Sequence, residues 1–152
     1  MRKLFLTLIL LAVTGVSHAQ IVIDQAGDDW RSKVDSAISL IKTSPSFYYG
    51  GLLTVCDTIS FFNASFSSCD GSFQKKGTIF VSANDVRLGI QNIAAVIVHE
   101  SLHLNLRMQG ITIPPRQEEH LAYTYEWQFL KNLPGADRSL IKYAEERMKQ
   151  FR

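Results

Sequence analysis

The chain is poor in the features that mark several classes of protein. It has only two cysteines and four prolines in 152 residues, which excludes a dense disulfide scaffold and a proline-rich linker. It contains no internal repeat and no low-complexity tract, which argues against solenoid and fibrous architectures. The chain also has no large excess of charge of one sign. It has 16 basic and 14 acidic residues, and the difference of two is accounted for by Arg2 and Lys3. A chain that is neutral beyond its start indicates neither a nucleic-acid partner nor an anionic membrane surface.

Long hydrophobic runs are scarce, and only the first residues carry one. A positively charged start precedes the apolar run Leu4–Val13, and Ser17–Ala19 then fits the small-x-small pattern of a cleavage site. The run is too short for a convincing membrane-spanning helix, so an uncleaved anchor is the weaker alternative. Residues 1–19 are therefore predicted to be a signal peptide. The mature chain would begin at Gln20, be secreted or periplasmic, and have no stable membrane insertion.

Residues 20–152 have the length of a single domain with one core. In an exported chain, we expect the only two cysteines, Cys56 and Cys69, to form a disulfide across a short loop. Closing a loop of about 15 residues would stabilise the fold by roughly 3 kcal/mol in the entropic model. The alternatives are two free thiols or metal ligands, although the spacing matches no short Cys-x-x-Cys pair.

The first half of the mature chain reads as one helix followed by short strands. Asp28 or Asp29 can cap a helix that runs to about Lys42 with an apolar stripe on one face. Residues 47–83 are rich in aromatic, β-branched and small residues, which favours strands and turns. Gly50-Gly51 and Asp70-Gly71 predict turns, and the most clearly predicted strand is Gly77–Ser82.

The second half reads as helices. A long apolar helix around residues 90–108 should end at Gly110, and the prolines in 111–116 predict an extended segment. Further helices are expected over Gln117–Asn132 and over Ala136–Gln150, the last packing outside the others. The pattern predicts an α+β domain with a small antiparallel or mixed sheet and a central helix.

That central helix carries the pattern His99-Glu100-Ser101-Leu102-His103 within an apolar run. Positions i and i+4 lie on the same face of a helix, so both imidazoles can point at one metal ion. Glu100 lies about 100° round the axis and can reach a water at that point. Burying these groups is costly unless something compensates them, and a zinc ion would do so. This is the physical basis of the His-Glu-x-x-His zinc-hydrolase signature.

Two histidines and a water leave a tetrahedral zinc ion one protein ligand short. Carboxylates on the following helix are candidates, because two antiparallel helices joined by a short loop can place one of them over the histidine pair. That helix supplies Glu118, Glu119, His120 and Glu126.

Residues 78–130 resemble the gluzincin class of zinc metallopeptidases. In that class a glutamate on the second helix, commonly followed three residues on by an alanine, completes the zinc site. The segment Glu119-His120-Leu121-Ala122 matches this pattern and implies that Glu119 is the third ligand. Glu118 is the alternative ligand, and Glu126, two turns further along the same face as Glu119, could hold a histidine N–H.

The resemblance also implies a fold and a substrate. It implies a minimal zincin-like domain in which the strand before the motif helix, Thr78–Ser82, lies at a sheet edge and pairs with a peptide. The transition-state stabiliser of the class has no matching position, although Tyr123 and Tyr125 lie nearby in the sequence.

Together these features predict an exported peptidase with one Zn²⁺ ion, a peptide or protein substrate, and Glu100 as general base. The alternative is a secreted binding or structural module whose metal site is degenerate or purely structural.

Overall fold

The computed structural model describes residues 21–24, 28–69 and 76–152. The expected signal peptide, its cleavage site and the Asp70-Gly71 turn lie outside these residues. The described elements are, in order, β1 (Val22–Asp24), α1 (Asp28–Thr43), α2 (Ser46–Val55), β2 (Cys56–Phe62), β3 (Phe66–Ser68), β4 (Gly77–Ser82), α3 (Ala83–Arg87), α4 (Ile90–Met108), α5 (Pro115–Asn132) and α6 (Arg138–Gln150).

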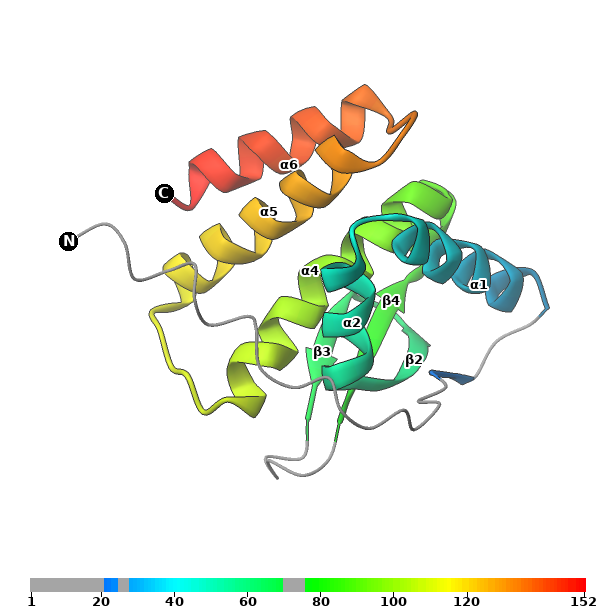
Figure 1. The fold of residues 1–152 in the computed structure, drawn as a ribbon, viewed down its shortest axis with the longest axis horizontal. Coiled ribbons are helices and arrows are strands. Elements are labelled where there is room, and N and C mark those ends of the chain that lie inside the picture. Colours follow the sequence, from blue (N-terminus) through cyan, green and yellow to red (C-terminus); the bar gives the residue numbers. More distant parts are fainter. Residues whose placement is uncertain (1–20, 25–27, 70–75) are drawn as a thin grey trace.

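Helix α4 is the centre of the molecule. It contacts α1, α2, α3 and α5 as well as strands β3 and β4, whereas α6 packs chiefly on α5 (Figure 1). The apolar residues before the motif explain this position, because Ile93, Ala94, Ile97 and Val98 are all buried. A helix that is apolar on most of its circumference is stable only when other elements cover it. The sequence prediction of a buried central helix is confirmed.

The sheet is mixed and has the strand order β1-β2-β4-β3, with only β3 antiparallel. The predicted strand Gly77–Ser82 is confirmed as β4, and Ile79 and Val81 point into the core. However, β4 lies between β2 and β3, so the expectation that it forms the sheet edge is wrong. The short strand β3 occupies that edge.

Helix α2 corrects the prediction of strands and turns immediately after residue 47. Gly50-Gly51, expected as a turn, lies inside this helix. The physical reason is tertiary packing: Tyr48, Leu52 and Val55 recur at helical spacing and are each at most 2% exposed. Burial of one face has outweighed the weak helix propensity of glycine and of the aromatic residues.

The other predicted helices are confirmed, with small shifts at their ends. Helix α1 buries the expected apolar stripe, and α4 ends just before Gly110, whose φ of 65° is the left-handed conformation that glycine adopts readily. Helix α5 begins at Pro115, two residues earlier than expected. A proline is tolerated at the first helical position because that N–H has no partner within the helix.

The expected Cys56–Cys69 disulfide is not formed, because both cysteines are free thiols. Cys56 pairs with Gly77 of β4, and the antiparallel register that aligns Ser68 with Thr78 places Cys69 beyond Gly77 on the other side. Cys56 and Cys69 are therefore separated by two strand spacings, which is about 9.5 Å. A disulfide needs Cα atoms within about 7 Å, so strand β4 keeps the two thiols apart.

The described residues therefore form an α+β domain with a four-stranded mixed sheet, as the sequence predicts at that level. No helix among the described residues is long and apolar enough to cross a membrane.

Candidate metal centre

Helix α4 places the two motif histidines one turn apart and facing the same point. The Nε2 atoms of His99 and His103 are 3.2 Å apart, and the two residues are only 8% and 5% exposed. Their convergence follows from the i, i+4 spacing on a helix whose apolar residues hold it in the core.

Helix α5 brings a carboxylate to the same point. The Glu119 oxygens lie 3.7 Å from Nε2 of His99 and 3.5 Å from Nε2 of His103. One ligand atom from each of these three residues lies within 4.8 Å of the others. Ala122, one turn after Glu119, is fully buried, and its small side chain suits the close approach of α4 and α5.

Each histidine is also held at its other ring nitrogen. Nδ1 of His99 lies 2.9 Å from Glu126, and Nδ1 of His103 lies 2.6 Å from Glu118. Ionised carboxylates only accept hydrogen bonds, so each Nδ1 carries the proton and donates it. The structure places Glu126 where the sequence suggested, whereas Glu118 lies behind the His103 ring and not at the shared point.

This tautomer determines which atoms of the two imidazole rings face one another. With both protons on Nδ1, the two Nε2 atoms present lone pairs to each other and to the Glu119 carboxylate. Three electron-rich atoms close together, two of them on buried histidines, favour a proton or a cation between them. Tetrahedral zinc with Zn–N bonds of about 2.05 Å would separate two ligand nitrogens by about 3.3 Å. The Nε2–Nε2 distance of 3.2 Å therefore fits this ion.

The electrostatics around His99 also favour positive charge. Burial by itself lowers the pKa of His99, but the hydrogen bond and charge of Glu126, followed by the charges of Glu100 and Glu119, raise it above its ordinary value. The same negative surroundings that favour a bound proton would favour a bound metal cation.

Glu100 differs from the other glutamates of the site. It is 8% exposed, yet it forms no hydrogen bond or ion pair with any other residue that the structure describes. Its oxygens are not among the fully buried unpaired atoms of the described residues, which are Trp30 Nε1 and the Tyr48 hydroxyl. The charge of Glu100 is among those that raise the pKa of His99, so Glu100 lies near the histidine pair, where a proton acceptor for a water is required.

Of the two tyrosines considered from the sequence, only Tyr123 touches the histidine pair. Its ring packs edge-on against His99, with 4.5 Å between centroids. Tyr125 packs on Tyr48, with 4.9 Å between centroids, and belongs to the core. The Tyr123 hydroxyl accepts a hydrogen bond from Nε of Arg147 on α6. Sequence reasoning missed this arginine, because its position depends on how α6 packs.

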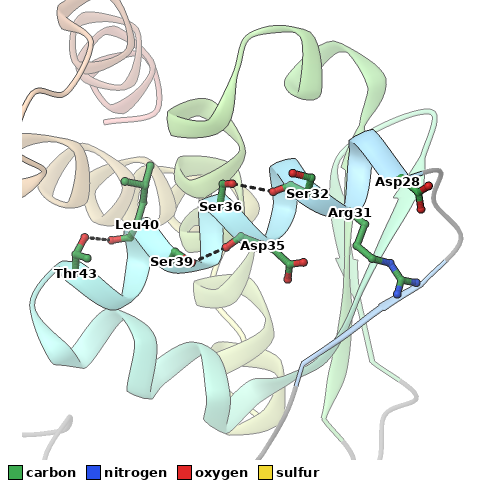
Figure 2. Close-up of a pocket in the computed structure, with 8 residues that line it drawn as sticks. All are labelled: Asp28, Arg31, Ser32, Asp35, Ser36, Ser39, Leu40 and Thr43. Atoms are coloured by element: carbon green, nitrogen blue, oxygen red, sulfur yellow. Dashed lines mark hydrogen bonds between the residues drawn. The ribbon is translucent and has the colours of Figure 1, made fainter.

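Another surface hollow lies away from this centre, along the outer face of α1. It measures about 590 Å³ and is lined by eight residues of that helix alone (Figure 2). The hydroxyl groups of Ser36, Ser39 and Thr43 donate to carbonyls of the same helix. Their hydroxyl protons are therefore already used within the helix, and the hollow contains none of the residues of the metal centre.

Comparisons of the chain with protein-family models, curated proteins and solved structures find no match. The candidate site is therefore interpreted from its own geometry.

Proposed function

We propose that this chain is an exported zinc-dependent peptidase of the zincin type. The observation that supports the proposal most directly is the convergence of His99 Nε2, His103 Nε2 and a Glu119 oxygen while both Nδ1 atoms are held by carboxylates. Two imidazoles and one carboxylate are a typical ligand set for catalytic zinc, which keeps its fourth position open. Four protein ligands would instead indicate a structural zinc site, and this constellation has three.

When bound, zinc acts as a Lewis acid and lowers the pKa of a coordinated water to about 7. The residues of the chain would do the rest. Glu100 would accept the proton of the attacking water and later deliver it to the leaving amine. Glu126 and Glu118 would keep His99 and His103 in the tautomer that leaves Nε2 free for the metal.

A peptide is the proposed substrate because β3, the edge strand of the described sheet, is bonded to the helix that carries the histidines. Arg107, one turn after His103, donates to the Ser67 carbonyl of β3 at 2.7 Å and to its hydroxyl at 3.1 Å. Strand β3 is therefore tied to the motif helix at the outer edge of the sheet, where an extended peptide can add as a further strand. Such a peptide would have to displace Arg107 from the Ser67 carbonyl or bind around it.

The decisive variant is Glu100→Gln, which keeps the shape of the side chain and removes its basicity. We expect it to retain one zinc ion per chain, measured by elemental analysis, and to lose cleavage of casein and of a mixed peptide library. General-base catalysis contributes typically about a hundred- to ten-thousand-fold, so the loss should be of that size. His103→Ala should lose both the metal and the activity.

A matched control is Glu146→Gln, which removes one carboxylate from the exposed face of α6. It should retain both metal and activity. Equal cleavage by the parent and by Glu100→Gln would contradict the mechanism. Zinc binding without turnover in the parent would favour a structural metal site in a secreted binding module, and no zinc binding would reject the metal centre itself.

A further inference from the structure

A second hollow adjoins the metal centre and has no role in the mechanism described above. It measures about 340 Å³ and is lined by Pro115, Arg116, Glu119, Gln150 and Phe151. Glu119 is shared between the hollow and the metal centre, so a group bound in the hollow would lie beside a metal-bound substrate. The last residues of the chain form the opposite wall.

One side of this hollow carries a fixed guanidinium group. Arg116 donates from Nε to the Phe151 carbonyl at 3.4 Å and from Nη2 to the carbonyls of Gln150 and Arg152, at 3.3 and 3.0 Å. These bonds satisfy carbonyls at the C-terminal end of α6 and hold the arginine in place. Its Nη1 has no hydrogen-bond partner among the residues that the structure describes.

A second guanidinium group lies behind the same wall. Arg147 packs over the rings of Tyr123 and Phe151, at 5.2 and 5.0 Å from their centroids, and donates from Nη1 to Gln150 at 2.6 Å. Its Nε hydrogen bond to Tyr123 raises the pKa of Arg147, with a smaller contribution from the Glu119 charge. Within the described part of the chain, its Nη2 has no hydrogen-bond partner.

We propose that this hollow binds a carboxylate of the peptide substrate close to the scissile bond through Arg116, which lines it, while the charge of Arg147 behind the wall adds to the attraction. The inference rests on the proposed peptidase function. An arginine that is already held in place can bind a carboxylate at little entropic cost, and charge-assisted bonds from a guanidinium group are strong. The rings of Tyr123 and Phe151 stack nearly parallel, and the guanidinium group of Arg147 lies over both of them.

The carboxylate can come from the C-terminus of a peptide or from an aspartate or glutamate side chain. Four probes separate these sources. They are acetyl-tetra-alanine as the free acid and as the amide, and two amidated hexapeptides that differ only in one glutamate or glutamine at the fourth position. Binding is measured by calorimetry on zinc-loaded Glu100→Gln protein, and cleavage by mass spectrometry on the zinc-loaded parent.

We expect at least one carboxylate probe to bind about ten- to a hundred-fold more tightly than its uncharged match. Arg116→Gln should abolish most of that ratio. Zinc remains bound in this variant. A loss of the binding preference therefore cannot be explained by attraction between the carboxylate and the zinc ion. The control Lys142→Gln removes one positive charge from the exposed face of α6 and should leave the ratio unchanged. A C-terminal preference would indicate an enzyme that acts on chain ends.

Equal binding of charged and uncharged probes would overturn this proposal while leaving the peptidase intact if cleavage occurs. An unchanged ratio in Arg116→Gln would also overturn it. Cleavage of no probe, together with an Arg116-dependent binding preference, would support the carboxylate site and argue against the peptidase. The two proposals can therefore fail separately.

Discussion

At the scale of single residues, the candidate site depends on how each imidazole is held. His99 and His103 are buried, and a different carboxylate accepts the hydrogen bond from the Nδ1–H of each. A neutral imidazole can bind a metal through only one nitrogen, so the hydrogen bond at the other nitrogen selects the tautomer. Glu126 and Glu118 therefore matter although neither reaches the shared point.

Replacing either of these carboxylates should weaken the metal site without removing a ligand. Glu126→Gln and Glu118→Gln are each expected to lower zinc affinity about ten- to a hundred-fold, because the imidazole loses its ionised partner. Competition against a chromophoric chelator measures this. Glu145→Gln on α6, which breaks only an ion pair with Lys149, should leave the affinity at the parent value. Parent-like affinity in both test variants would refute the role given to these glutamates.

The two cysteines should differ in reactivity. Burial raises the pKa of the Cys56 thiol to about 12, with smaller effects from neighbouring groups. Its reactive thiolate is therefore scarce at pH 8, whereas Cys69 is partly exposed. Native protein treated with iodoacetamide should gain one adduct, on Cys69, and denatured protein should gain two. A protein mass two hydrogen atoms below that of the dithiol form, with no adduct after denaturation, would show that the disulfide expected from the sequence does form.

At the scale of elements, the site is made by the packing of α4 against α5. Close packing between elements can also depend on a single residue. A side chain at Gly77 of β4 would clash with Leu104 of α4 and would lie 2.6 Å from the Ser68 carbonyl. Strand β4 can therefore approach both neighbours only because residue 77 has no side chain. Gly50 differs, since a side chain there would meet nothing within 4 Å.

Alanine at these two glycines should have opposite effects on the free energy of unfolding. Gly77→Ala should destabilise by about 1–3 kcal/mol, because neither the strand backbone nor Leu104 can move freely. Gly50→Ala should stabilise by about 0.5–1 kcal/mol, because alanine favours an exposed helical position. Urea denaturation measures both. Destabilisation by Gly50→Ala would contradict the helical assignment of α2.

At the scale of the whole molecule, α4 joins two parts. On one side lie the sheet and helices α1 and α2, and on the other lies the α5–α6 hairpin, which runs side by side beyond α4 (Figure 1). The histidines belong to α4 and Glu119 belongs to α5, so a bound ion would bridge the hairpin to the rest of the domain.

Zinc should therefore stabilise the folded chain as a whole. At a free concentration of about a thousand times the dissociation constant, a ligand that binds only the folded state adds about 4 kcal/mol. We expect a higher Tm with zinc than after EDTA treatment, measured by calorimetry. His103→Ala should show no such difference. An equal shift in parent and variant would place the ion at another site.

The sequence by itself determined the motif helix, its burial and the two-histidine pattern. These features depend on spacing within one helix and on an apolar surround, both of which are local. It also indicated the strand before the motif, the helices α1, α5 and α6, and the glutamates of α5 as the source of a further ligand.

Tertiary structure alone decided which glutamate reaches which nitrogen, because Glu118 and Glu119 are adjacent and only the orientation of α5 against α4 separates their roles. It also decided that α2 is a helix, since burial of Tyr48, Leu52 and Val55 outweighed local propensity. The position of β4 inside the sheet, the separation of Cys56 from Cys69, and the approach of Arg147 to Tyr123 depend on contacts between segments far apart in the chain. No local pattern encodes such contacts, because their free energy appears only when both surfaces are buried together.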